Sequence, residues 1–145
     1  MTKLKMYVAV HLFLLKEDKI LLLRRYNTGF MDGKYSVVAG HVDSGETYVE
    51  AMKRVAKEEA GIVIADDDIR PVQVMHRNSD TERIDYFFVA KKWDGEIRNM
   101  EPNKCDELSW FPLNDLPLNM IPYVRHAFEM YQKEEQFTMF GWSNN

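Results

Sequence analysis

The stretch that most constrains the fold covers residues 40–62, GHVDSGETYVEAMKRVAKEEAGI. Its middle part consists mostly of good helix formers and contains no proline or glycine. We therefore predict a helix over residues 46–60. Asp43 or Ser44 stands where an N-cap is expected, and Gly61 stands where a left-handed residue ends a helix.

At roughly 100° per residue, the apolar side chains of this predicted helix collect on one face. We expect the following residues to pack on the core: Val49, Met52, Ala56, Ala60 and Val63. Glu58 and Glu59 emerge beside this face, and Val55 is predicted to point between them. Two carboxylates therefore flank one edge of the buried stripe.

The rest of the chain alternates between strand patterns and one further helix pattern. Strands are predicted over residues 7–15, 19–25, 35–39, 69–75, 83–91 and 108–111. The first two form a hairpin, and residues 121–136 have the apolar spacing of an amphipathic helix. Strands with two separated helices predict an α/β fold, an α/β/α sandwich on a mixed sheet. The length suits a single domain over residues 1–145.

Charge and cysteine content exclude several classes. A net charge of −4 argues against a protein that binds a nucleic acid polymer, because such proteins display basic surfaces. The single cysteine, Cys105, suits a reducing cytoplasm. The apolar run of residues 6–15 is interrupted by His11 and has no cleavage site, so we read it as a strand and expect no membrane association.

The spacing within residues 40–62 resembles the signature of the Nudix hydrolases, the MutT-like family. That signature is glycine, five residues, glutamate, seven residues, arginine-glutamate, an aliphatic residue, any residue, glutamate-glutamate, any residue, glycine and an aliphatic residue. The matching positions are Gly40, Glu46, Arg54, Glu58, Glu59 and Gly61. Val55 replaces the glutamate that normally follows the arginine. The resemblance implies the Nudix α/β/α sandwich, and the order of elements agrees over nearly the whole chain.

The resemblance also implies a metal-dependent hydrolase that uses Mg²⁺, or Mn²⁺, to cleave a diphosphate linkage. Glu58, Glu59 and the carbonyl of Gly40 would be metal ligands, since hard cations prefer oxygen. Arg54 would orient the glutamates, with Glu46 as its partner. A simpler reading gives Arg54 only surface pairs with neighbouring glutamates one helical turn away.

A further acidic residue often comes from a distant loop in this family. Glu101 is the preferred candidate because it lies in the middle of the segment 99–107, whereas Glu107 adjoins the predicted strand. An exposed loop acid without function is the alternative. Since Val55 removes one carboxylate, Glu101 becomes more important, as a ligand or as a general base.

Candidate substrate-binding residues are Arg24, Arg25 and Asn119. Either arginine could bind phosphate, and strand alternation predicts that only one of them faces the site. Asn119 resembles the asparagine with which MutT-type enzymes read a purine edge, but it could equally cap the last helix. The aromatic tail 137–142 is expected to pack on the domain or on a second subunit, which leaves a homodimer open.

Together these observations predict a cytoplasmic enzyme that acts on a small nucleotide and releases a monophosphate. A purine (d)NTP is the first substrate candidate, and nucleotide sugars, ADP-ribose and dinucleoside polyphosphates are alternatives. A different class is a nucleotide-binding module whose catalysis is weakened by Val55. Retention of Arg54, Glu58 and Glu59 favours the enzyme.

Overall fold

The computed structural model describes residues 2–142 and contains, within them, eight strands and two α-helices. In chain order the elements are β1 (Tyr7–Lys16), β2 (Lys19–Arg25), β3 (Tyr35–Ser36), β4 (Val38–His41), α1 (Tyr48–Ala60), β5 (Ile69–Asn78), β6 (Glu82–Ala90), β7 (Cys105–Pro112), α2 (Pro122–Gln132) and β8 (Phe137–Phe140). A single 3₁₀ turn, Asp66–Asp68, precedes β5.

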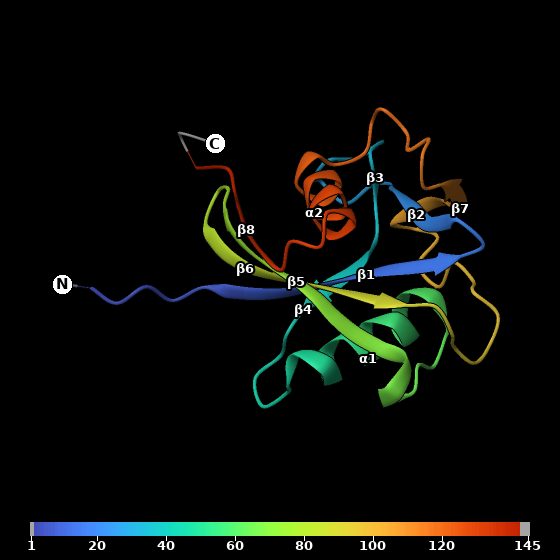
Figure 1. The fold of residues 1–145 in the computed structure, drawn as a ribbon, viewed down its shortest axis with the longest axis horizontal. Helices are drawn as coiled ribbons and strands as arrows, with labels where there is room; N and C mark the ends of the chain where they lie inside the picture. The colour runs from blue at the N-terminus through green and yellow to red at the C-terminus, as the bar shows by residue number, and fades with distance from the viewer. Residues whose placement is uncertain (1, 143–145) are drawn as a thin grey trace.

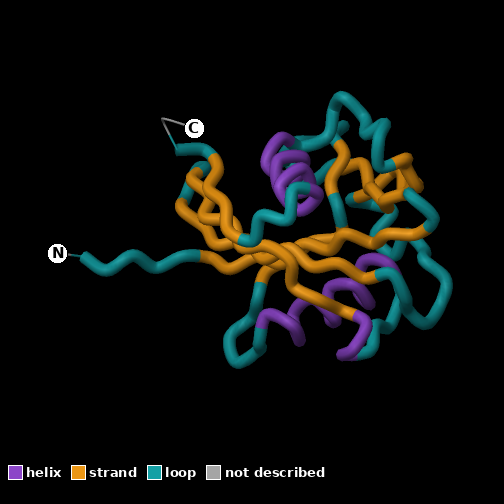
Figure 2. The backbone as a smooth tube through the Cα atoms, viewed as in Figure 1, coloured by secondary structure: helices purple, strands orange, loops and turns teal. Residues whose placement is uncertain are grey.

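The strands form a mixed sheet in the order β3-β2-β1-β6-β5-β8, with β4 paired to β1 and β7 paired to β2. β1 runs parallel to β6 and antiparallel to β4. Helix α1 covers one face of the sheet and α2 the other (Figure 1), and Figure 2 shows the helices on opposite sides of the strands. The predicted α/β/α sandwich with a mixed sheet is confirmed. Neither helix of the described chain is long and apolar enough to cross a bilayer.

The apolar run of β1 is explained by burial on both faces of the sheet. Leu12 and Leu14 point into the core beneath α1, while Phe13 and Leu15 point into the core beneath α2. Because successive side chains of a strand point to opposite faces, a strand covered on both sides needs apolar residues at every position. This central strand therefore holds the two halves of the core together.

The predicted hairpin between the first two strands is confirmed. Glu17 and Asp18 have φ angles of 52° and 63°, as a two-residue hairpin turn requires. The two strands pair only next to this turn, at Leu15 with Ile20 and at Lys16 with Lys19. Beyond it they diverge, because β1 joins β4 and β6 while β2 joins β7.

Helix α1 begins two residues later than predicted, and its N-cap is Thr47 rather than Asp43 or Ser44. The hydroxyl of Thr47 accepts from the Glu50 N–H at 3.1 Å, and the Glu50 carboxylate accepts from the Thr47 N–H at 2.9 Å. This capping box satisfies two backbone groups at once. At the other end Gly61 has a φ of 70°, so the predicted stop is confirmed.

The buried face of α1 also differs from the prediction. The buried residues are Ala51, Met52, Val55, Ala56 and Ala60. Val55 is 2% exposed and lies in the core rather than between the two glutamates, whereas Val63 is 51% exposed. Val63 leaves the stripe because the left-handed Gly61 turns the chain out of the helical path.

The chain after α2 forms a strand that the sequence did not predict. Helix α2 ends at Gln132, four residues earlier than expected, and β8 then pairs in parallel with β5. The indole of Trp142 donates to the carbonyl of His76 at 3.0 Å. The part of the aromatic tail that the structure describes therefore packs on its own domain.

Candidate functional site

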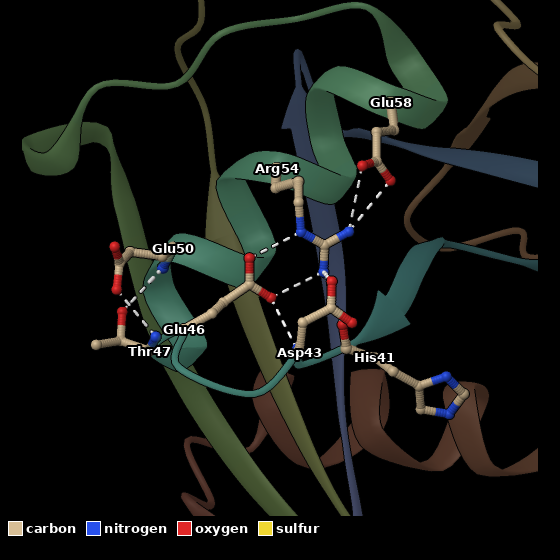
Figure 3. A network of polar contacts seen from close by, with 7 residues as sticks. All are labelled: His41, Asp43, Glu46, Thr47, Glu50, Arg54 and Glu58. Carbon is tan, nitrogen blue, oxygen red and sulfur yellow. Dashed lines mark hydrogen bonds and ion pairs between the residues drawn. The ribbon is translucent and has the colours of Figure 1, made fainter.

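Arg54 lies at the centre of a polar network that joins α1 to the loop after β4 (Figure 3). Its Nε and Nη2 each donate to the carboxylate of Glu46 at 2.8 Å, and Nη2 also donates to the carbonyl of His41 at 2.9 Å. On the other side Nη1 donates to both oxygens of Glu58, at 3.2 and 3.3 Å. The guanidinium thus fixes the path of the chain immediately after Gly40.

Both sequence readings of Arg54 are partly realised. It binds Glu46, as the motif implies, and it also pairs with Glu58 one turn away. Glu50 takes no part, because its carboxylate belongs to the capping box. The hydrogen bonds from Arg54, and then the backbone N–H of Asp43, lower the pKa of Glu46 to about 2. Glu46 is therefore an ionised anchor for Arg54 at neutral pH.

Glu59 faces a cavity of about 480 Å³, which we call the acidic cavity. Its walls include Arg25, Asn27, Thr28, Ala39, Gly40, His41, Glu59, Asn99, Glu101 and Lys104. The Glu59 carboxylate accepts the backbone N–H of Ala39 at 3.1 Å. Burial first, and then the nearby charges of Glu101 and Glu58, together raise the pKa of Glu59 to about 7, against that hydrogen bond. This carboxylate lacks sufficient counter-charge in its surroundings.

Glu101 reaches the same cavity from the loop before β7. Asn99 holds this loop, because its side chain donates to the Cys105 carbonyl at 2.7 Å and accepts the Glu101 N–H at 3.0 Å. Glu107 lies instead within β7, where its carboxylate is 3.6 Å from Arg24. The geometry thus favours Glu101 over Glu107 as the loop acid, and its role stays a prediction.

The donor set of the acidic cavity suits a hard divalent cation. Two carboxylates, of Glu59 and Glu101, and the backbone of Gly40 line it, and hard cations take oxygen ligands. Glu58 points away, since its carboxylate is held by Arg54. Within residues 2–142, no three acidic, histidine or cysteine side chains already converge as a metal site. Completing the predicted ligand set therefore requires Glu58 to leave Arg54.

Of the two neighbouring arginines, only Arg25 lines the acidic cavity. Its Nε donates to the Phe30 carbonyl at 2.6 Å and its Nη2 to the Thr28 hydroxyl at 3.0 Å. Arg24 turns to the neighbouring strand, where Nε donates to Asp106 at 2.8 Å. The alternation of side chains along β2 explains why one arginine faces the site and the other does not.

Asn119 does not cap α2, so the capping reading is wrong. The N-cap position is Ile121, which offers no side-chain hydrogen bond. Instead the Asn119 amide donates to the Gly33 carbonyl at 2.9 Å, and its backbone carbonyl accepts the Tyr35 N–H. It therefore ties the loop after β2 to the segment before α2. Its predicted contact with a purine stays a prediction.

A second cavity, of about 360 Å³, adjoins the first and was missed at the sequence level; we call it the basic cavity. Its walls include Ala9, His11, Arg25, Phe30, Ala39, Gly40, His41, Arg77, Asp80, Arg83 and Tyr123. His11, Arg77 and Asp85 form a buried hydrogen-bonded cluster behind it. The sequence did contain a signal for this cavity: ionisable residues stand at inward-facing positions of strands that are otherwise apolar.

Gly40 has to be glycine because of Val55. A methyl group on its Cα would lie 2.6 Å from Cγ2 of Val55, well inside the contact distance of two carbons. We expect Gly40→Ala to lower the free energy of unfolding by about 1–3 kcal/mol through overpacking. Val55→Ala should recover part of this loss in a double-mutant cycle measured by urea denaturation.

Val49→Ala is the matched control for that cycle. Val49 lies on the same helix and is partly buried, but it is not among the atoms nearest the added methyl. Gly40→Ala and Val49→Ala should therefore have additive effects. Additivity of Gly40→Ala with Val55→Ala would show that the close approach is relieved elsewhere.

Comparison with known proteins shows the family of this chain. The NUDIX domain family model matches residues 5–133. The chain is 28% identical over 130 residues to the 8-oxo-dGDP phosphatase NUDT18 of Mus musculus, covering 88% of this chain and 39% of that protein. It is 32% identical over 114 residues to the ADP-ribose pyrophosphatase of Methanocaldococcus jannaschii, covering 76% of this chain and 64% of that protein.

A solved structure shows the same fold. The crystal structure of the MutT NUDIX hydrolase from Burkholderia pseudomallei superposes with a TM-score of 0.79 at 26% identity, covering 86% of this chain and 97% of that one. The chain spans less than two thirds of the length of the two curated relatives described above. This chain belongs to the Nudix family.

Proposed function

We propose that this chain is a divalent-cation-dependent pyrophosphohydrolase that cleaves a nucleoside diphosphate-linked small molecule. The observation that carries the proposal is the acidic cavity, where Glu59 and Glu101 lie beside the backbone of Gly40 with Arg25 in the same wall. A cavity with carboxylates for a cation and a guanidinium for phosphate fits a polyphosphate.

Glu59, Glu101 and the Gly40 carbonyl would hold Mg²⁺ or Mn²⁺, and Glu58 would join them by leaving Arg54. The bound cation supplies neutralisation of phosphate charge and polarisation of the scissile phosphoryl group. Glu46 and Arg54 keep the loop after Gly40 in place. Glu101 serves as a ligand or as the general base for the attacking water.

The absence of a carboxylate at position 55 does not leave the cavity without acids. Val55 packs in the core against the backbone of Gly40, so it supports the loop rather than entering the cavity. Glu59 on the helix and Glu101 on the loop both remain. This arrangement supports an enzyme over a module that only binds nucleotide.

The substrate proposal is a purine (d)NTP, from which the enzyme would release a monophosphate. The name of one relative, 8-oxo-dGDP phosphatase, describes a purine nucleotide substrate for that protein. The name of another, ADP-ribose pyrophosphatase, keeps ADP-ribose as an alternative. Nucleotide sugars and dinucleoside polyphosphates share the same diphosphate chemistry.

A substrate panel tests this proposal. The protein is incubated with dGTP, 8-oxo-dGDP, ADP-ribose, a nucleotide sugar and diadenosine tetraphosphate, with Mg²⁺, with Mn²⁺ or with EDTA, and products are separated by chromatography. We expect cation-dependent release of a nucleoside monophosphate from at least one compound. Folded protein that binds nucleotides without hydrolysing any of them would show the nucleotide-binding module instead.

A further inference from the structure

Most of the polar side chains that line the basic cavity donate hydrogen bonds. Three guanidinium groups, of Arg25, Arg77 and Arg83, line it together with His11 and His41. The one carboxylate among its lining residues is Asp80, whose side chain is 75% exposed and pairs with Arg83 at 3.2 Å. A ligand in this cavity therefore meets an excess of positive charge and of N–H groups.

Two buried nitrogens at the basic cavity have no hydrogen-bond partner among residues 2–142, namely Nε of Arg83 and Nδ1 of His11. An arginine Nε always carries a hydrogen, so it can only donate. The side chain of His11 is 3% exposed and is fixed from behind, since its Nε2 lies 3.0 Å from the Asp85 carboxylate. A buried polar atom without a partner costs free energy, so both side chains would gain a hydrogen bond by turning these nitrogens toward a ligand in the cavity.

The arginines differ in how far their charges are already balanced. Arg77 is neutralised by Asp85, which its Nε reaches at 2.7 Å, and it stacks on the ring of Tyr123. Within the described residues, Arg25 donates to two uncharged groups, the Phe30 carbonyl and the Thr28 hydroxyl. Arg83 pairs with the carboxylate of Asp80, but that side chain is 75% exposed, so the pair is weak. Arg25 on β2 and Arg83 on β6 therefore remain available to an anion.

We propose that the basic cavity binds a phosphomonoester group, held by Arg83, Arg25 and His11. Such a group offers several anionic oxygens to the guanidinium donors. It also exchanges a proton near neutral pH, so it can either accept from or donate to the free imidazole nitrogen. A carboxylate offers fewer oxygens, and an uncharged nucleobase leaves the positive charge unbalanced.

The position of this cavity has a consequence for the substrate, and that consequence rests on the proposed function. Both cavities are lined by Arg25 and by the segment Ala39 to His41. A nucleotide whose diphosphate lies in the acidic cavity can thus extend into the basic cavity. The substrate class becomes a diphosphate-linked nucleotide that carries a further phosphate ester.

Phosphate binding is tested without turnover, by NMR of the imidazole nitrogens in protein kept free of metal with EDTA. Inorganic phosphate should shift the signals of His11 and His41 saturably and leave His76 and His126 unchanged. Arg83→Gln should weaken this binding by about tenfold or more, which is the size of one charge-assisted hydrogen bond. Arg70→Gln, an exposed arginine on β5, is the control and should not change it.

The outcomes separate the subsite from the activity. The proposed phosphomonoester site would be overturned if phosphate did not shift the imidazole signals of His11. It would also be overturned if adenosine shifted them more strongly than phosphate does. In hydrolysis, the wild type should prefer ADP-ribose 2′-phosphate to ADP-ribose, and Arg83→Gln should raise KM for the former alone. Equal KM values for both compounds in the wild type would reject the substrate class. Failure to hydrolyse any compound would reject the proposed function, and the phosphate titration would still decide whether the subsite exists.

Discussion

Replacing Glu59 by glutamine is expected to lower kcat for the best substrate by at least about a hundredfold, as loss of a charged group that stabilises the transition state does. The amide oxygen of glutamine can still accept the Ala39 N–H, so the local structure is kept. Because the amide is neutral, it also removes the cost of burying a charge near Glu101. The melting temperature in EDTA should therefore be unchanged or higher.

Glu129→Gln is the matched control, since Glu129 is an exposed glutamate on α2. It should change neither kcat nor the melting temperature. The diagnostic result is activity lost without stability lost, measured by steady-state kinetics and by thermal unfolding of the same preparation. If Glu59→Gln hydrolyses substrate at the wild-type rate, the acidic cavity is not where the reaction occurs.

Replacing Asp85 by asparagine should destabilise the fold by about 3–5 kcal/mol, the usual cost of breaking a buried ion pair. The Asp85 carboxylate is fully buried and contacts both His11 and Arg77. Without it, the guanidinium of Arg77 keeps its charge in a site where its side chain is only 7% exposed. The free energy of unfolding from urea titration measures this loss.

The same carboxylate predicts how stability depends on pH. Burial alone would raise the pKa of Asp85, but the hydrogen bonds and charges of His11 and Arg77 lower it to about 2. A lowered pKa means stabilisation that is present above the ordinary value of 3.8 and is lost as the pH falls toward 2. We expect about 2 kcal/mol of unfolding free energy to disappear over that window in the wild type.

Asp80→Asn separates this effect from surface electrostatics. Asp80 also pairs with an arginine, but its side chain is exposed. Its replacement should leave the urea midpoint and its acid dependence nearly unchanged. An Asp85→Asn variant with wild-type acid dependence would show that other carboxylates control the unfolding at low pH.

Much of the motif could be predicted from sequence because its signals are local. The helix of residues 48–60 and its stop at Gly61 follow from propensity and from one left-handed residue. The pairing of Arg54 with Glu46 was implied by the resemblance to the Nudix signature, and the structure contains it. The order of the elements up to α2 likewise follows from the hydrophobic periodicity of neighbouring residues, whereas β8 was not predicted.

Other features depended on which strands pair and in what register. Which of Arg24 and Arg25 faces the acidic cavity depends on the pairing of β2 with β7, because that pairing places Arg24 beside Asp106. The contact of His11 with Asp85 joins residues 74 positions apart, across β1 and β6. A contact between residues so far apart in the sequence cannot be predicted from the pattern of neighbouring residues.

In residues 40–62, the sequence determined which groups are present, and tertiary packing determined where they point. The spacing placed Glu58 and Glu59 on one helix, but only the packed structure turned Glu59 to the cavity and left Glu58 on Arg54. Val55 is buried because the closely approaching backbone of Gly40 leaves room for it. Helical periodicity predicts the direction in which each side chain leaves the helix axis. Which residues that side chain contacts depends on how the helix packs on the sheet.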